Sequence, residues 1–308
     1  MKTVIIGLGN QGKKRYKSVG KDCAATVDPI NKDADYKTIK DVPISIYDSA
    51  IISVQENYKL EIINYLIKFK KNILVEKPLY FKDKIKLKNI FDKAKKNRVV
   101  LYVAYNHRFE KSISYISKII KNNKLGKLYC CELTYGNGTS LTVKKNKWRD
   151  TDLGVISDLG SHLFDILCFW FGFKNIPKFE IKLLNSFENS APDYAILIAK
   201  SNINIVLKLS FCYWKNKFAS NIYFKKGSIH SNSLEKWEDT KVILRKRILP
   251  SGKPYERNIN FKKNDQTWLK EYKYFKYLVK NNISNDYEKN KWIQENFLYL
   301  QKKLANNK

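Results

Sequence analysis

The chain has 308 residues, of which 44% are hydrophobic and 14% aromatic, so it can bury a large core and is not a disordered tail protein. Its 59 Lys and Arg against 29 Asp and Glu give a formal net charge of +30, which raises nucleic acid and anionic membranes as partners. Nearly all of the excess positive charge comes from Lys, whereas proteins that recognise nucleic-acid bases favour Arg. The basic residues also form no cluster in the sequence. We therefore predict neither nucleic acid nor a membrane as a partner.

The first part of the chain alternates short apolar runs with stretches of helical period. The runs that read as buried strands are 3–6, 23–28, 50–54, 72–75 and 99–104. The stretches that read as helices between them include 59–70 and 83–96. Buried strands separated by helices are typical of βαβ units. We therefore predict an α/β Rossmann domain with a parallel, doubly wound sheet over residues 1–120.

The pattern changes after about residue 120. A helix is predicted at 109–121, a strand at 128–135 and a second helix at 160–171. Five further strand-like runs follow without helices between them, at 178–186, 195–200, 204–211, 219–224 and 241–247. This succession predicts an α+β domain with a largely antiparallel open sheet over residues 121–308. Two closing helices, 265–280 and 287–304, could pack back on the first domain, and we expect their Lys-rich faces to be solvated.

A glycine-rich motif follows the first strand and starts a helix. Its residues are Gly7, Leu8, Gly9, Asn10, Gln11 and Gly12. In such a G-x-G-x-x-G motif the glycines allow a tight turn, close approach of the backbone to a pyrophosphate, and close packing of helix on strand, while the helix N-terminus attracts the phosphates. Without further context, the same glycines would only make a tight turn. Lys13, Lys14 and Arg15 lie just inside the helix, where they could assist phosphate binding or be solvated.

An aspartate at the end of the second strand adds to this motif. Asp28 is placed to accept hydrogen bonds from a ribose hydroxyl pair, and its charge would repel a 2′-phosphate. We therefore predict that the first domain binds NAD in preference to NADP.

Five short motifs later in the chain carry a family resemblance. They are Glu-Lys-Pro-Leu at 76–79, Tyr-Asn-His-Arg-Phe at 105–109, Leu-Gly-Lys at 125–127, Trp-Arg at 148–149 and Asp-Leu-Gly-Ser-His-Leu-Phe-Asp at 158–165. Together with the glycine motif, their order and spacing resemble the Gfo/Idh/MocA family, named for glucose–fructose oxidoreductase and inositol dehydrogenase. The resemblance implies a Rossmann domain followed by an α+β domain whose open sheet often forms the interface of a dimer or tetramer.

The resemblance also implies an activity and site residues. It implies hydride transfer between a nicotinamide cofactor and a secondary hydroxyl or ketone of a sugar, cyclitol or sugar nucleotide. The implied catalytic residues are Lys77, Asp158 and His162. Cofactor contacts are expected from Val54, Glu76 and Lys77, besides Asp28 and the glycine motif. Substrate contacts are expected from Asn106, Arg149, Asp158 and His162. The family often has a cis peptide at the position of Lys77–Pro78.

The proposed chemistry is physically reasonable. Removal of a hydride from a carbinol carbon requires that the hydroxyl proton be taken, which suits a histidine of near-neutral pKa, while a lysine can polarise the oxygen. On a regular helix Asp158 and His162, four residues apart, would share one face. Asp158 or Ser161 could instead cap that helix, and His162 could be a structural histidine. His107 and Arg108 are expected to organise the joint between the domains, and His230 belongs to no motif.

Two segments depart from the family's pattern. Residues 54–59 read Val-Gln-Glu-Asn-Tyr-Lys where the family has Thr-Pro-Asn followed by a histidine, so the cofactor contacts of this loop are open. Residues 152–154 retain one glycine of the family's glycine triplet, so the substrate should not be taken from one relative. Two alternatives therefore stay open: a reductase of another carbonyl or conjugated substrate, and a non-catalytic protein that senses NAD.

The remaining features bear on compartment and metal. Five cysteines, an odd number without a Cys-x-x-Cys pair, favour a reducing compartment, and the chain starts on a strand-like run without a charged leader. We therefore expect a cytoplasmic protein. The three histidines have no spacing typical of metal ligands, so we predict no metal site.

Overall fold

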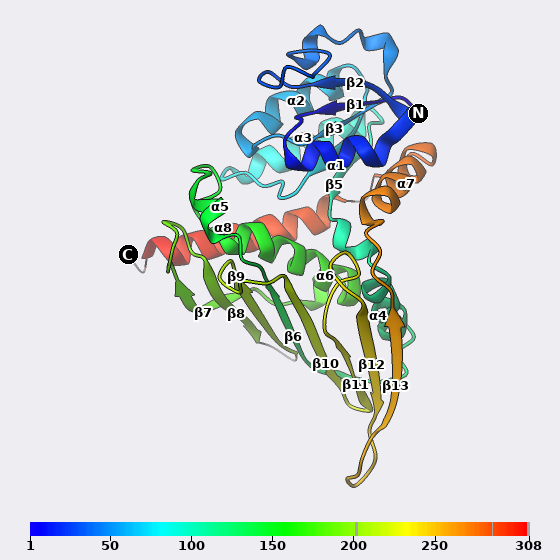
Figure 1. Cartoon of the computed structure of the whole chain (residues 1–308), viewed down its shortest axis with the longest axis vertical. Helices are drawn as coiled ribbons and strands as arrows, with labels where there is room; N and C mark the ends of the chain where they lie inside the picture. The colour runs from blue at the N-terminus through cyan, green and yellow to red at the C-terminus, as the bar shows by residue number, and fades with distance from the viewer. Residues whose placement is uncertain (201–202, 285, 307–308) are drawn as a thin grey trace. The chain divides into compact units, whose positions relative to one another are not determined.

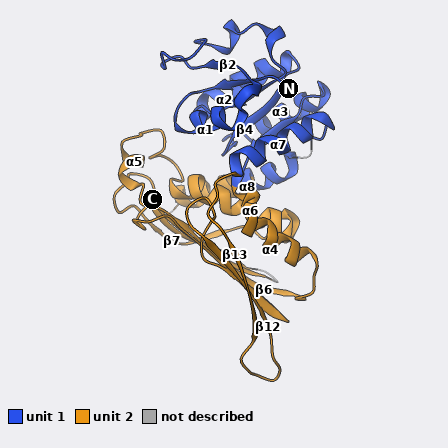
Figure 2. Ribbon diagram, turned by 45° about the vertical axis from the view of Figure 1, so that its right-hand side comes forward, with its two compact units in different colours: residues 1–106, 267–294 blue, residues 107–266, 295–308 orange. Residues whose placement is uncertain are grey.

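The computed structural model describes residues 1–200, 203–284 and 286–306. The chain forms two compact units (Figure 2): unit 1 comprises Met1–Asn106 and Thr267–Gln294, and unit 2 comprises His107–Gln266 and Glu295–Lys308. Unit 1 is therefore assembled from two separate stretches of the sequence.

Unit 1 is built on five short strands with helices between them (Figure 1). Its strands are β1 (Thr3–Ile6), β2 (Cys23–Val27), β3 (Ser49–Ile52), β4 (Asn72–Glu76) and β5 (Leu101–Ala104). Its helices are α1 (Asn10–Val19), α2 (Glu56–Lys68), α3 (Lys84–Lys96), α7 (Thr267–Lys280) and the first part of α8 (Tyr287–Asn306). Between β2 and β3 the chain forms only the short 3₁₀ turns Ile39–Asp41 and Ile44–Ile46.

The five strands form one parallel sheet in the order β2-β1-β3-β4-β5. This confirms the predicted α/β domain with a parallel sheet. The strand order reverses direction between β1 and β3, and in such open sheets ligands bind beyond the carboxyl ends of the strands at this switch point. The residues that directly follow the strands are therefore candidates for ligand binding.

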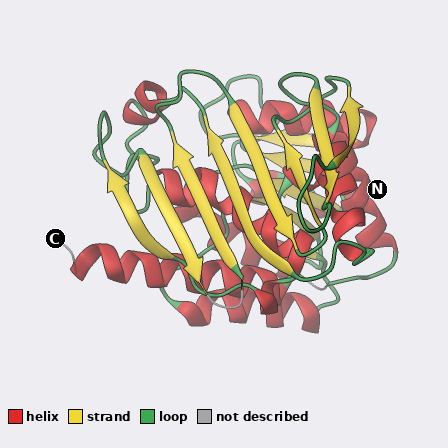
Figure 3. Cartoon of the chain, turned by 90° about the horizontal axis from the view of Figure 1, so that it is seen from below, coloured by secondary structure: helices red, strands yellow, loops and turns green. Residues whose placement is uncertain are grey.

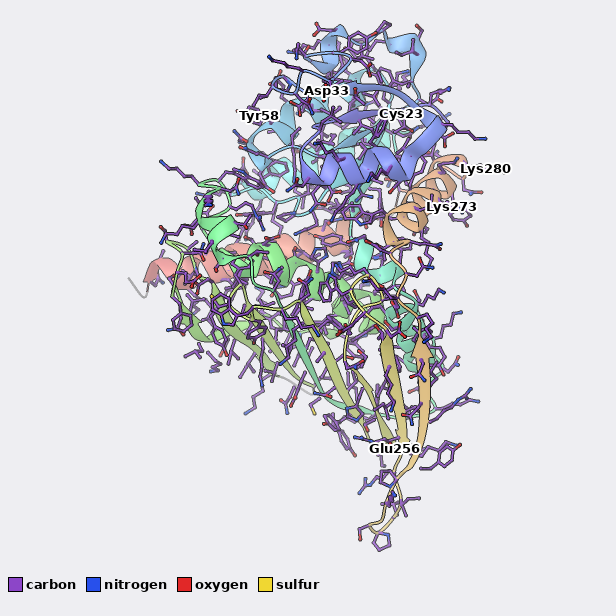
Figure 4. The ribbon with its side chains drawn as sticks, in the orientation of Figure 1. Cys23, Asp33, Tyr58, Glu256, Lys273 and Lys280 are labelled. Carbon is purple, nitrogen blue, oxygen red and sulfur yellow. The ribbon has the colours of Figure 1, made fainter. Side chains whose placement is uncertain are left out.

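Helix α7 completes the core of unit 1. Tyr272, Phe275 and Leu278 of α7 pack in one buried cluster with Ile5 of β1 and Leu74 of β4. The opposite side of the helix is charged. Lys273 and Lys280 are exposed and point outward from α7 (Figure 4), as predicted for its Lys-rich face. In α8 the prediction fails for Lys289, which is buried and pairs with Asp286 at 2.8 Å.

Unit 2 contains a sheet of eight strands with helices on one side. Its strands are β6 (Leu128–Gly136), β7 (Glu180–Asn185), β8 (Tyr194–Lys200), β9 (Asn204–Ser210), β10 (Lys217–Phe224), β11 (Gly227–Ser231), β12 (Thr240–Lys246) and β13 (Tyr255–Phe261). Its helices are α4 (Lys111–Lys121), α5 (Ser140–Lys144), α6 (Ser161–Phe171) and the end of α8. In Figure 3 the strands face the reader and helices lie behind them.

The sheet has the order β13-β12-β11-β10-β6-β9-β8-β7. Every neighbouring pair is antiparallel except β6 and β9, which are parallel, so the predicted largely antiparallel α+β domain is confirmed. Along β6 the residues Cys131, Leu133 and Tyr135 are buried, whereas Glu132 between them is exposed and Thr134 is half-buried. This alternation shows that one face of the sheet forms the core, as expected for an antiparallel sheet covered on one side.

Two observations on the described part of the chain concern membrane-spanning helices and metal ligands. None of its helices combines the length and the apolar character that crossing a membrane requires. Within the same residues, no three His, Cys, Asp or Glu side chains are grouped so that they could hold a metal ion.

Candidate active site

Most of the predicted cofactor residues follow the carboxyl ends of the parallel strands of unit 1. Gly7 follows β1, Asp28 follows β2, and Lys77 follows β4. Val54 comes two residues after β3, and its Cγ1 would lie 3.0 Å from a Cβ atom on Gly7. The structure thus brings Val54 against the glycine loop, at the switch point between β1 and β3.

Each glycine of the loop has a different environment. Gly7 has φ +90°, a left-handed conformation that favours glycine, and its N–H donates to Val27 O at 2.7 Å. A Cβ atom on Gly12 would collide with the carbonyl group of Gly7, so glycine is required there for helix α1 to pack on the loop. A Cβ atom on Gly9 would meet nothing within 4 Å. Gly9, the N-cap of α1, therefore faces open space where a ligand could approach.

Asp28 is bonded directly to this loop. One oxygen of its carboxylate accepts the N–H of Leu8 at 2.7 Å, and the other accepts the N–H groups of Ile30 at 2.9 Å and Asn31 at 2.8 Å. Partial burial of the carboxyl raises its pKa, but the hydrogen bonds outweigh this effect and the pKa of Asp28 is lowered. The side chain is therefore held as an anion beside the glycine loop.

The carboxylate of Glu76 has a structural partner. Its Oε1 accepts a hydrogen bond from Nε of Arg15 at 2.6 Å, and Nη2 of Arg15 pairs with Glu271 of α7 at 2.8 Å. The Arg15 guanidinium also lies 4.4 Å from the ring centroid of Trp268 and is 1% exposed. Arg15 is therefore neither solvated nor available to phosphates, which corrects both interpretations of this residue from the sequence. It ties α1 and α7 to the strand that precedes Lys77.

The backbone around Lys77 is held by a second buried cation. The Lys77–Pro78 peptide is cis. Lys59 of α2 donates to the carbonyl oxygens of Glu76 and Pro78, each at 2.8 Å, and pairs with Glu56 at 3.2 Å. The residue is 1% exposed. Burial lowers the pKa of Lys59, partly offset by Glu56. In the sequence, residues 54–59 depart from the pattern of the family. In the structure, Lys59 of this segment contacts Glu76 and Pro78, the two neighbours of Lys77 in the chain.

Asn106, the last residue of unit 1 before the chain enters unit 2, is 5% exposed. Its side-chain amide donates to Oγ1 of Thr267 at 3.0 Å. This bond ties the residue after β5 to the start of α7. It gives Asn106 a structural contact in addition to its predicted contact with the substrate.

In unit 2, His162 lies in a cluster of aromatic and basic side chains. Its ring centroid is 3.8 Å from that of His107 and 5.9 Å from that of Tyr135. Nε2 of His107 lies 3.2 Å from the hydroxyl of Tyr135 and 2.8 Å from Nζ of Lys236. An ammonium group has no lone pair, so Nε2 of His107 accepts from Lys236 and His107 is neutral in this contact. Burial raises the pKa of Tyr135, which therefore keeps its hydroxyl proton.

Asp158 is paired with Arg149. Nη2 of Arg149 lies 2.5 Å from Oδ2 of Asp158, and both side chains are 27% exposed. Asp158 lies in a π-helical turn, Ile156–Gly160, that runs directly into α6. Because of this turn, Asp158 and His162 are not four positions apart on one regular α-helix, as the sequence argument assumed. Neither Asp158 nor Ser161 caps the helix with its side chain.

Further charged groups surround this cluster. Arg108 forms a two-pronged ion pair with Asp165, one of whose bonds measures 3.0 Å, which fixes the residue after His107 against α6. Glu110 is 1% exposed and lies beside Glu235. Burial, with a smaller contribution from Glu235, raises the pKa of Glu110 to about 9. The Glu110 carboxyl group therefore keeps its proton at neutral pH.

Within unit 1 the structure brings together the glycine loop, Asp28 and Val54, and it places Lys77 between two anchored carbonyl groups. Within unit 2 it pairs Arg149 with Asp158. Sequence reasoning missed the contact of His107 and Lys236 in the His162 cluster. His107 belongs to the Tyr-Asn-His-Arg-Phe motif, but Lys236 belongs to no motif. Lys236 reaches His107 only in the folded chain, because the two residues lie far apart in the sequence.

Comparison with known proteins identifies the family. Residues 117–289, more than half of the chain, match the family model described as the C-terminal alpha/beta domain of the Gfo/Idh/MocA oxidoreductase family. The chain therefore belongs to the Gfo/Idh/MocA oxidoreductase family.

Two curated relatives match part of the chain. An uncharacterised oxidoreductase of Schizosaccharomyces pombe is 30% identical over 125 residues, which are 40% of this chain and 33% of the relative. Glucose-6-phosphate 3-dehydrogenase of Bacillus subtilis is 28% identical over 107 residues, 33% of this chain and 30% of the relative. The matched stretches thus span about a third of the length of these relatives.

Solved structures match the fold over nearly the whole chain. A protein of Desulfitobacterium hafniense described as an NADPH-dependent oxidoreductase superposes with a TM-score of 0.84 at 15% identity, covering 99% of this chain and 96% of that one. Levoglucosan dehydrogenase in complex with NADH gives 0.81 at 14% identity, with coverages of 98% and 97%. UDP-N-acetylglucosamine 3-dehydrogenase of Acidithiobacillus ferrooxidans gives 0.79 at 14% identity, with coverages of 98% and 97%. At these identities the likeness shows the fold.

Proposed function

We propose that the protein is an NAD-dependent dehydrogenase that transfers a hydride between the nicotinamide and a secondary hydroxyl or ketone of a sugar, cyclitol or sugar nucleotide. The observation that carries the proposal is the arrangement at the strand ends of unit 1. There the glycine loop opens at Gly9, Asp28 is held as an anion beside it, and Lys77 follows β4. In this proposal residues 1–120 supply the cofactor site together with Lys77 and Asn106, and residues 121–308 supply the other substrate contacts and the assembly surface.

The residues of unit 1 fit a dinucleotide. The first turn of α1 contains no acidic residue, so its N-terminus can attract a pyrophosphate past Gly9. The anionic Asp28 suits the two hydroxyl groups of a ribose and disfavours a 2′-phosphate, which supports NAD over NADP. When bound, NAD accepts the hydride from the carbinol carbon or, in its reduced form, returns it.

The side chains of the protein handle the proton. His162 takes the hydroxyl proton when the alcohol is oxidised and returns it when the ketone is reduced. The Lys77 ammonium stabilises the negative charge that develops on the same oxygen. Asp158, held by Arg149, orients His162 or binds a hydroxyl group of the substrate. Asn106 and Arg149 add polar contacts to the substrate.

The relatives support the substrate class. Levoglucosan dehydrogenase, glucose-6-phosphate 3-dehydrogenase and UDP-N-acetylglucosamine 3-dehydrogenase are named for a sugar derivative, a sugar phosphate and a sugar nucleotide. We propose the same broad class for this chain, in a reducing compartment such as the cytoplasm. We also propose a homodimer or homotetramer formed through the face of the eight-stranded sheet turned away from its helices.

The test is absorbance of the reduced nicotinamide with NAD or NADP and a panel of cyclitols, sugars, sugar phosphates and sugar nucleotides. We expect turnover with at least one of them, and a loss of about 10²-fold or more in kcat in both Lys77→Met and His162→Asn. Tight binding of NADH with no turnover on any substrate would favour an NAD sensor. Turnover limited to conjugated or other carbonyl compounds would favour the alternative reductase. Turnover that survives both substitutions would contradict the proposed mechanism.

A further inference from the structure

Lys59 occupies a position where a lysine is unfavourable unless it has a specific task. It lies in the first turn of α2, where the positive end of the helix dipole disfavours a cation. Its side chain is 2% exposed, although Lys is rarely buried without a partner. The remaining cost must be offset by its contacts, and these identify the task.

The contacts of Lys59 bracket one residue. Its Nζ lies 2.8 Å from the carbonyl oxygen of Glu76 and 2.8 Å from that of Pro78, which are the two neighbours of Lys77 in the chain. Glu56, one turn earlier on the same helix, supplies the third contact at 3.2 Å and balances the charge. A single ammonium group thus fixes the backbone on both sides of Lys77.

From this geometry we propose that Lys59 is a positioning residue, whose buried ammonium group clamps the carbonyl groups of Glu76 and Pro78 and thereby sets the direction of the Lys77 side chain. The inference rests on the proposed catalytic role of Lys77. It adds that the orientation of the Lys77 side chain depends on a residue of helix α2, a different element from the strand that precedes Lys77. The buried pair of Arg15 and Glu76 anchors the same segment through the side chain of Glu76, whereas Lys59 holds this segment through its backbone carbonyl groups.

The clamp predicts a particular kinetic effect. Without the ammonium group, the carbonyl groups of Glu76 and Pro78 lose a hydrogen-bond donor and the segment can shift. A misplacement of about 1 Å can reduce the rate about 10²-fold, whereas binding of NAD through the glycine loop and Asp28 would be little affected. We therefore expect the defect in kcat and not in KM.

The first experiment compares Lys59→Met, which keeps the size of the side chain but removes its charge, with Lys59→Arg, which keeps a cation. Lys68→Met, at an exposed lysine of the same helix, is the matched control. In Lys59→Met we expect kcat to fall about 10- to 100-fold with KM values within about threefold of wild type. Lys59→Arg should recover at least part of kcat, and Lys68→Met should match wild type. A Lys59→Met enzyme with unchanged kcat, or with a raised KM alone, would overturn the proposal.

The second experiment requires no turnover. An amine-reactive reagent is applied to the folded proteins, and the labelling rate of Lys77 is followed by peptide mass spectrometry. We expect the rate to change at least threefold in Lys59→Met and not in Lys68→Met, and an unchanged rate would overturn the clamp. If wild type is inactive on every substrate, the proposed function fails, while the labelling rates still decide whether Lys59 positions Lys77.

Discussion

The imidazole rings of His107 and His162 lie 3.8 Å apart between their centroids, and His107 in turn accepts a hydrogen bond from Lys236. A proton taken up by His162 therefore arrives next to a neutral ring whose orientation is fixed by a lysine and by Tyr135. His107 thus belongs to the environment that controls the proposed acid/base residue.

We predict that His107→Leu lowers kcat about tenfold or more, because the His162 ring loses its packing partner and general acid–base catalysis of this kind contributes about 10²- to 10⁴-fold. The affinity for NADH should not change. Steady-state kinetics and NADH fluorescence titration measure the two quantities. His230→Gln is the control, since the ring of His230 contacts Asn221 of β10 and Ser228 of its own strand β11. Equal kcat in His107→Leu and wild type would contradict the prediction.

Two substitutions in the glycine loop should affect different properties, one the stability of the fold and the other the binding of NADH. Gly12→Ala places a methyl group against the Gly7 carbonyl, so we expect a loss of about 1–3 kcal/mol of stability from overpacking. Gly9→Ala meets no atom within 4 Å, and its backbone angles suit alanine, so its Tm should stay close to wild type. We nevertheless expect weaker NADH binding in Gly9→Ala, because the methyl group fills the space proposed for the pyrophosphate. Unchanged NADH affinity in Gly9→Ala would place the cofactor elsewhere.

Substitution of Asp28 should change both selectivity and affinity. In Asp28→Ser the negative charge is lost, so we expect the ratio of NADPH to NADH affinity to rise about tenfold, which corresponds to about 1.4 kcal/mol. The absolute affinity for NADH should fall as well, because the N–H of Leu8 loses its acceptor. Asp28→Asn retains an acceptor and should lose less NADH affinity. Fluorescence titration with both reduced cofactors measures these changes, and a wild type that binds NADPH as tightly as NADH would contradict the role of Asp28.

The buried Glu110 predicts a dependence of stability on pH. Its pKa is raised to about 9 in the folded protein, while in the unfolded chain it returns to its ordinary value of 4.5. Between these values the unfolded chain releases the proton and the folded protein keeps it, so rising pH favours unfolding. Glu110→Gln has no proton to lose. Relative to wild type, its free energy of unfolding should therefore rise with pH across this window, by at most about 1.4 kcal/mol per pH unit.

Urea unfolding at pH 5, 7 and 9 measures this difference. Glu132→Gln, at an exposed carboxylate of β6, serves as the control and should parallel wild type. A difference between Glu110→Gln and wild type that is constant with pH would show that Glu110 ionises normally in the folded protein.

Most of the helices and strands could be predicted, because the spacing of hydrophobic residues along the sequence differs between a helix and a strand. The strands of unit 1 are almost entirely buried, and along β8, β9 and β10 buried residues alternate with more exposed ones. The sequence did not reveal β11 and β13, for identifiable reasons. Strand β11 is short and rich in small polar residues (Gly-Ser-Ile-His-Ser), and β13 is an edge strand whose residues are mostly exposed. Such strands form because a neighbouring strand offers hydrogen bonds, which a local pattern does not show.

Residues of the candidate site that lie in short contiguous motifs could be predicted from the sequence. Residues whose contacts come from other elements of the fold could not. The glycine loop, Asp28 and Lys77 follow from local spacing. The burial of Lys59 and Arg15 does not, because composition suggests that a lysine or arginine on a helix is solvated and their partners lie far along the chain. The π-helical turn before His162 likewise depends on packing, since Gly160 of this turn lies against Leu209 of β9.

The second carboxylate that neutralises Arg15 comes from α7, which follows all of the strands of unit 2 in the chain. During synthesis the parallel sheet of unit 1 therefore leaves the ribosome before unit 2 but lacks Glu271 and the aromatic face of α7 until the strands of unit 2 have been made. An N-terminal fragment that ends before residue 267 would leave a buried guanidinium short of one counter-charge and part of the core uncovered. The unit proposed to bind the cofactor is thus begun before unit 2 in translation, but it is completed only after the strands of unit 2.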